Sequence, residues 1–165
     1  NWFMGRFLRH GDPFAKLALF KPSAGRYEKI DEDCWSHLDM EIHEHPILDG
    51  SIGTIHSPID HDDRRGLESY LGKHNDYSSW EARRYLSLGH VGSPEWNALT
   101  DRQRSKYRRI EKWWFPLAYF MMSYILKRGF LDGRAGFVFA KLKSQYYWQI
   151  QLKIQEAKDR QSGSK

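Results

Sequence analysis

The hydrophobic pattern of the chain changes at Asp63, and this change limits the possible folds more than any other feature. Before it, short apolar runs are interrupted by glycine and proline, as expected of short strands joined by turns. After it, apolar residues recur every three or four positions over 67–86, the spacing of an amphipathic helix. The sequence therefore predicts an α/β chain, in detail an α+β fragment, whose short strands precede amphipathic helices.

The part after Asp63 predicts several helices. One covers 67–86, either as a single helix or as two helices broken at Ser78-Ser79, and Asp62 or Asp63 is its expected N-cap. Another begins at Thr100 or Asp101, and a last one covers about 137–158. We expect residues 161–165 to form a disordered tail.

The part before Asp63 predicts strands at 14–20, at 26–28, around Ile42 and at 53–59, and a helix end or a covering loop at 2–8. The stretch 40–63 holds four of the eight histidines of the chain and six carboxylates. Burying such groups unpaired costs several kcal/mol each. Their accumulation between apolar runs therefore predicts a chemical site.

His43-Glu44-His45 and Asp60-His61-Asp62-Asp63 are the two candidate site motifs. On a strand, His43 and His45 point to one face and Glu44 to the other. The two histidines could bind a metal ion, or Glu44 could act as a general base, or the triplet could be a solvated surface strand. His61 could be a single metal ligand held by neighbouring carboxylates, or the acidic motif could simply cap a helix.

Charge is distributed unevenly along the chain. Residues 1–100 carry 11 Lys and Arg against 16 Asp and Glu, a balance of −5, whereas residues 101–165 carry 15 against 5, a balance of +10. The basic part contains the apolar run 113–126, which spans about 21 Å as a helix, less than the ~30 Å of a bilayer core.

The residues around this run indicate a helix that lies on a membrane surface. The expected membrane-surface residues are Arg108, Arg109, Lys112, Trp113, Trp114, Lys127 and Arg128. Nucleic-acid binding would also explain the charge, but the aromatic residues form one block and are not spaced as stacking platforms. An ordinary core helix is the third alternative.

The order of motifs along the chain resembles that of a known family. The matching motifs are Ile42-His43-Glu44, Gly50, His61, Tyr70-Leu71-x-Lys73-His74-Asn75-x-Tyr77, Glu81-Ala82 and Gly129-Phe130-Leu131-Asp132-Gly133. Together they resemble the C-terminal half of bacterial family 2 glycosyltransferases of the lipopolysaccharide-core and exopolysaccharide type. The resemblance covers most of residues 9–158.

This resemblance implies the C-terminal part of a GT-A nucleotide-diphospho-sugar transferase core. In such enzymes a preceding half with an Asp-x-Asp motif binds the nucleotide-sugar donor and most of a divalent metal, Mg²⁺ or Mn²⁺. The resemblance implies that Glu44 is the catalytic base and that His61 contacts the metal or the diphosphate. It assigns acceptor contacts or structural support to His43, His45, Lys73, His74 and Asn75.

The expected organisation follows from both lines of reasoning. Residues 1–62 would form the acceptor-side end of the catalytic core, 63–100 a helical extension and 101–160 the membrane-surface helices. The expected partners are a nucleotide sugar, a lipid-linked or lipopolysaccharide acceptor and an anionic membrane, without nucleic acid. The expected location is cytoplasmic, peripheral on the inner face of the bacterial inner membrane. The alternative function is a non-enzymatic basic module that binds nucleic acid or a partner protein.

Overall fold

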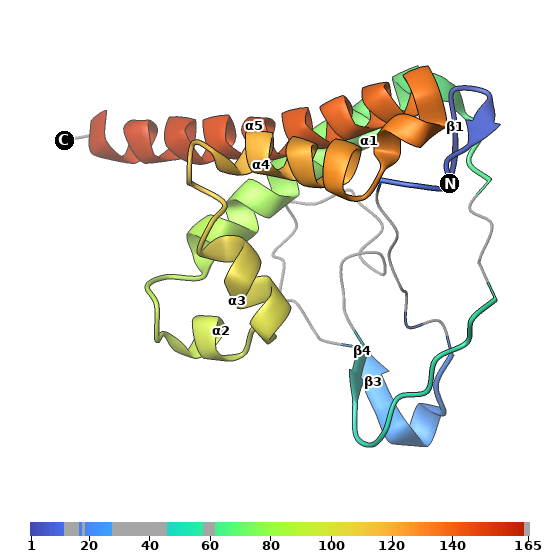
Figure 1. Ribbon diagram of the computed structural model, residues 1–165. Coiled ribbons are helices and arrows are strands. Elements are labelled where there is room, and N and C mark those ends of the chain that lie inside the picture. Colours follow the sequence, from blue (N-terminus) through green and yellow to red (C-terminus); the bar gives the residue numbers. More distant parts are fainter. Residues whose placement is uncertain (12–16, 18, 28–45, 58–61, 164–165) are drawn as a thin grey trace. The chain divides into compact units, whose positions relative to one another are not determined.

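The chain forms two compact units. The computed structural model describes residues 1–11, 17, 19–27, 46–57 and 62–163. Unit 1 comprises Asn1–Asp12 and His61–Lys165, and unit 2 comprises Pro13–Asp60 (Figure 1). This division differs from the predicted one, because the first residues of the chain belong with the helices.

Helix α1, Gly66–Ser87, is continuous, so the predicted break at Ser78-Ser79 is wrong. The Ser78 hydroxyl donates to the carbonyl oxygen of Asn75 at 2.7 Å and is itself fully buried. A serine that bonds back to its own helix in this way is compatible with the helix interior. Neither Asp62 nor Asp63 is the N-cap, since α1 begins after Arg65 without a side-chain cap.

Two short helices, α2 (Pro94–Asn97) and α3 (Asp101–Tyr107), follow α1. Ser93 caps α2 by accepting a hydrogen bond from the backbone N–H of Trp96 at 3.1 Å. Thr100 and Gln103 form a reciprocal capping box at the start of α3, which confirms the predicted helix start.

The apolar run continues as α4, Phe115–Met121, and then as the π-helical turn η3, Met122–Leu126. Pro116 lies in the first turn of α4, where a missing N–H has no consequence. A 3₁₀ turn, η4 (Gly129–Asp132), leads into the long helix α5, Gly133–Gly163. The predicted disordered tail is therefore wrong for residues 161–163, which are helical.

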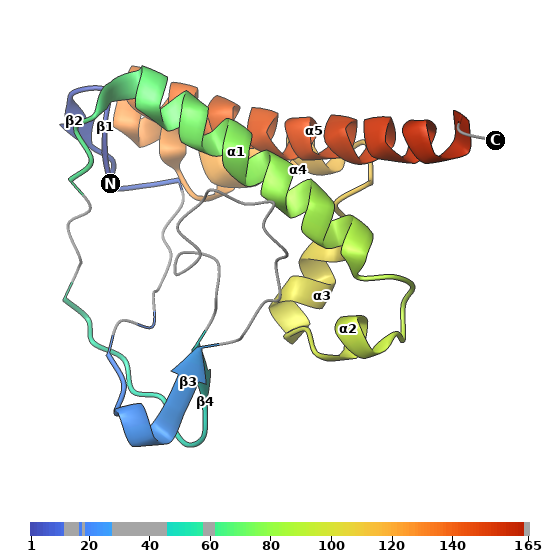
Figure 2. The same ribbon diagram turned by 180° about the vertical axis from the view of Figure 1, so that it is seen from behind.

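Helix α5 packs between α1 and α4 (Figures 1 and 2). Ile150 and Ile154 on α5 are almost completely buried, and burial of such a side chain stabilises by about 1.5–3 kcal/mol. The core around them comprises Ala82, Leu88, Trp96, Leu99, Tyr107, Ile110, Ile150 and Ile154.

A second core cluster ties the start of the chain to α5. Strands β1 (Trp2–Phe3) and β2 (Arg6–Phe7) form an antiparallel hairpin, where a helix end or loop was predicted. Met4 and Gly5 have φ of 48° and 81°, the positive values that a two-residue hairpin turn of this kind requires. The hairpin places Phe3 5.3 Å from Phe139, measured between ring centroids.

Unit 2 contains a 3₁₀ turn, η1 (Pro22–Ala24), and strands β3 (Gly25–Tyr27) and β4 (Pro46–Leu48), which pair antiparallel. Strand β3 confirms the strand predicted at 26–28 over its described part. The strand predicted at 53–59 is wrong over its described residues, since 51–57 have no regular structure. The strand predicted around Ile42 and most of the one at 14–20 fall on residues that the structure does not describe.

The surroundings of two helical glycines predict opposite effects of a glycine-to-alanine substitution on stability. A Cβ on Gly136 of α5 would come within 2.0 Å of the carbonyl oxygen of Gly129, whereas a Cβ on Gly72 of α1 meets nothing within 4 Å. We expect Gly136→Ala to lower the free energy of unfolding by about 2–3 kcal/mol through overpacking. Gly72→Ala should raise it by about 0.5–1 kcal/mol through helix propensity. Urea denaturation checks both, and equal stability of the two variants would contradict the close contact of η4 with α5.

Candidate functional site

The four residues predicted to do the chemistry, His43, Glu44, His45 and His61, lie outside the described residues. Within the part of the chain that the structure describes, no group of three or more His, Cys, Asp or Glu side chains could hold a metal ion. The described structure instead presents two features: a polar network where the chain enters α1, and an exposed apolar surface on α4.

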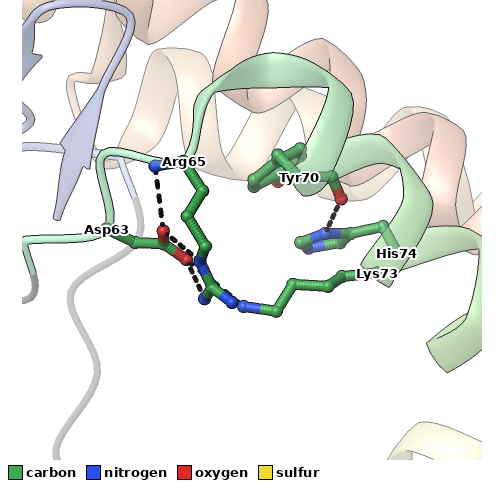
Figure 3. A network of polar contacts seen from close by, with 5 residues as sticks. All are labelled: Asp63, Arg65, Tyr70, Lys73 and His74. Atoms are coloured by element: carbon green, nitrogen blue, oxygen red, sulfur yellow. Dashed lines mark hydrogen bonds and ion pairs between the residues drawn. The ribbon is translucent and has the colours of Figure 1, made fainter.

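The polar network begins at Asp63, two residues after His61 (Figure 3). The Asp63 carboxylate accepts hydrogen bonds from Arg65 Nη2 at 2.6 Å and from Lys73 Nζ at 3.2 Å. The side-chain hydrogen bond from Arg65, aided by Lys73, lowers the pKa of Asp63 well below its usual range. The Asp63 carboxylate thus binds two cations. Because Lys73 lies on α1, its contact connects the segment before α1 to the helix.

His74 is neutral at pH 7 and has a defined tautomer. Its Nδ1 lies 2.8 Å from the carbonyl oxygen of Tyr70, so Nδ1 carries the proton and Nε2 carries the lone pair (Figure 3). The ring stacks on Tyr70 at 3.9 Å between centroids. Burial, together with the charges of Lys143 and Lys73, lowers the pKa of His74 to about 4, against the opposing effect of the hydrogen bond to Tyr70.

Asn75 contacts α5. Lys153 Nζ donates to Asn75 Oδ1 at 2.9 Å and to the Asn75 carbonyl oxygen at 2.8 Å. The same ammonium group contacts the hydroxyls of Ser78 and Ser79, each at 2.7 Å. Lys73, His74 and Asn75 therefore each make contacts within unit 1, and each of the three has a different partner.

Glu81 is a buried carboxylate whose partners the sequence did not indicate. It accepts hydrogen bonds from Tyr107 Oη at 2.5 Å and from Lys106 Nζ at 2.8 Å, both on α3. Burial and the negative charge of Glu81 raise the pKa of Tyr107 above its usual range. Glu81 was noted only as part of a motif. No local spacing connects it to residues 25 and 26 positions later.

The solvent-exposed side of α4 and η3 is apolar. Trp114, Leu117, Met121 and Ile125 recur at helical spacing, and all four are exposed. The flanking Trp113 and Leu126 are 82% and 78% exposed. A surface helix ordinarily turns polar residues to water. We call these six residues the α4 surface.

In the sequence, cations flank the α4 surface, which itself contains no carboxylate. The sequence contains no Asp or Glu between Lys112 and Leu131. Of the predicted membrane-surface residues, Arg108, Arg109, Lys112 and Arg128 are exposed and Lys127 is half-buried.

The acidic residue just before this segment, Glu111, faces elsewhere. Its carboxylate accepts hydrogen bonds from Tyr85 Oη at 2.5 Å and from Lys158. The charge that remains next to the α4 surface is therefore positive.

Among the described residues, none of the helices combines the length and the apolar character needed to cross a membrane.

Comparison with protein-family models, curated proteins and solved structures finds no match to this chain. The resemblance to family 2 glycosyltransferases therefore depends on the order of its motifs alone.

The lowered pKa of His74 predicts a pH effect on stability. Between pH 6.5 and about 4 the unfolded chain binds a proton at this position that the folded chain does not. The free energy of unfolding should therefore fall as the pH is lowered through this window, and this contribution should be constant above pH 6.5. In His74→Asn, the amide keeps a donor for the Tyr70 carbonyl but does not titrate.

Urea denaturation of His74→Asn at several pH values tests this effect. We expect a shallower decline between pH 6.5 and 4 than in the unaltered protein. The decline below this window, to which Asp63 and Asp132 contribute through their lowered pKa values, should remain. Equal slopes within the window would show that His74 is not held neutral by the fold.

Proposed function

We propose that this chain is part of an inverting glycosyltransferase that acts at an anionic membrane surface. It would transfer a sugar from a nucleotide sugar to a lipid-linked, lipopolysaccharide or exopolysaccharide acceptor. The observation that carries the proposal is the α4 surface, which combines exposed Trp and aliphatic side chains with flanking cations and no carboxylate. An enzyme with a lipid-linked acceptor needs such a surface to remain near its substrate.

The chemistry of the α4 surface fits the boundary between lipid headgroups and acyl chains. Trp113 and Trp114 supply amphipathic rings of the kind that is enriched at this boundary. Leu117, Met121 and Ile125 would bury apolar area, at about 25 cal/mol per Å². Each Lys or Arg near an anionic leaflet adds about 1 kcal/mol of attraction. Nucleic acid would use the cations but would leave the aliphatic side chains in water.

Glu44 is the proposed general base, which removes the proton of the acceptor hydroxyl as that oxygen attacks the anomeric carbon of the donor. A carboxylate can perform this step when it lies within hydrogen-bonding distance of the hydroxyl. His61 would stabilise the negative charge of the leaving diphosphate. A divalent ion, Mg²⁺ or Mn²⁺, would be held mainly by the donor-binding half of such an enzyme, together with His61.

Co-sedimentation with lipid vesicles tests membrane attachment. Leu117→Glu places a negative charge in the middle of the α4 surface, and we expect it to weaken binding to phosphatidylserine-containing vesicles about tenfold or more. Leu71→Glu is the matched control, because Leu71 is 43% exposed on α1, on the other side of α5 from α4. The control should bind like the unaltered protein.

Two outcomes would contradict membrane attachment. One is an unaltered protein that sediments with neither anionic nor neutral vesicles. The other is equal loss of binding in Leu117→Glu and Leu71→Glu, which would show a general charge effect. In either case the alternative, a module whose α4 surface binds a partner protein, would take precedence.

Glu44→Gln tests the proposed base. In an enzyme that carries this chain together with a donor-binding half, we expect the substitution to abolish sugar transfer and to leave donor binding nearly unchanged, because the amide cannot accept the proton. Turnover assays and donor titration measure the two effects separately. Retained turnover would remove Glu44 from the mechanism.

A further inference from the structure

The corner between η3 and α5, residues 126–131, contains a residue in an unfavourable backbone conformation. Arg128 has φ of 58°, in the left-handed region that favours glycine. Non-glycine residues in this region are uncommon and, when the surrounding structure enforces them, often belong to functional sites. Arg128 therefore occupies a backbone conformation in which glycine would be less strained.

Hydrogen bonds to the start of the chain hold this corner from the inside. The Asp132 carboxylate, 3% exposed, accepts from the backbone N–H groups of Arg9 and His10 at 3.0 and 2.8 Å and contacts His10 Nδ1 at 3.2 Å. Gly11 N–H donates to the carbonyl oxygen of Lys127 at 3.0 Å.

The glycine after Arg128 adds a steric constraint. A Cβ at Gly129 would lie 2.9 Å from the carbonyl oxygen of Ser123. The backbone next to Arg128 is therefore packed closely against Ser123, which limits any change of φ that would relieve the strain at Arg128.

The outside of the corner is apolar around this arginine. Leu126, Phe130 and Leu131 are all exposed, and Arg128 is exposed among them. The carboxylate that follows the corner, Asp132, is buried and accepts hydrogen bonds from Arg9 and His10. The corner thus presents an exposed arginine together with three exposed apolar residues that neighbour it in the sequence.

At the opposite end of the α4 surface, one of the exposed cations is already engaged. Arg109 donates to the carbonyl oxygen of Ser105 at 2.9 Å and to its hydroxyl at 2.6 Å, so part of its guanidinium group is occupied. The corner differs from that end because its exposed arginine stands in the sequence beside three exposed apolar residues, Leu126, Phe130 and Leu131.

We propose that the corner is the part of the chain that enters the headgroup layer, with Leu126, Phe130 and Leu131 inserted and Arg128 bound to the phosphate of an anionic phospholipid. This inference depends on the proposed attachment to membranes and names its point of insertion. A guanidinium group binds phosphate oxygens in a bidentate manner, and the apolar neighbours exclude water from that contact. The strained, fixed turn aims the side chain before the membrane is reached.

Arg128→Gly gives a test in which stability and binding change in opposite directions. Glycine relieves the left-handed conformation, so the midpoint of urea denaturation should be unchanged or higher. Binding to vesicles of phosphatidylcholine and phosphatidylserine should weaken about fivefold, which corresponds to the loss of one cation near an anionic surface. The dependence of binding on salt should become shallower.

Two further variants separate charge from insertion. Arg102→Ala removes an exposed cation that lies on α3 and outside the corner, and it should change vesicle binding less than twofold. Leu126→Ser should weaken binding without altering its salt dependence, because it removes only apolar area.

The outcomes distinguish this inference from the proposed function. If Arg128→Gly or Leu126→Ser binds vesicles like the unaltered protein while Leu117→Glu does not, the corner proposal is wrong and membrane attachment stands. Equal losses in Arg128→Gly and Arg102→Ala would also overturn it, since any cation would then serve. If the unaltered protein binds no vesicles, both proposals fail together.

Discussion

The packing of α5 between α1 and α4 is the interaction on which the rest of unit 1 depends. One side of α5 contributes Ile150 and Ile154 to the core shared with α1, and its other side meets α4, where Tyr147 packs against Phe115 at 5.0 Å between ring centroids. One side of α4 is therefore packed against α5, and the α4 surface is a separate, exposed apolar side of the same helix. Because the packing of the core does not account for this exposed side, the α4 surface bears on function.

Local signals in the sequence were sufficient to predict where the helices lie, but not the long-range contacts and the hairpin that join the parts of the chain. The start of α3 was predictable because Thr100 and Gln103 are three residues apart and cap each other. The break expected at Ser78-Ser79 was wrong because the Ser78 hydroxyl bonds back to the Asn75 carbonyl oxygen within α1, and Lys153, 75 residues later, contacts the same hydroxyl. The first hairpin was missed because its strands have two residues each and its turn requires a positive φ at Met4, which composition does not indicate.

The same limit applies to the candidate site. Exposed residues of the α4 surface and its flanks, such as Trp113 and Arg128, could be predicted because charge and aromatic content are properties of a short segment. The contacts of Glu81 with Lys106 and Tyr107 could not, since they form only when α3 folds onto α1. For Glu44 and His61, the prediction still depends on the order of motifs.

The contact of Asp132 with residues 9 and 10 has a consequence for how the protein is made. Arg9 leaves the ribosome 123 residues before its partner carboxylate does. At translation rates of about 5–20 residues per second, roughly 6–25 s pass between the synthesis of Arg9 and that of Asp132. During this time Phe3 lacks its contact with Phe139, and the backbone N–H groups of Arg9 and His10 lack the Asp132 carboxylate. Unit 2 is synthesised entirely within that interval. The helical unit can thus complete its packing only after all of unit 2 has been synthesised.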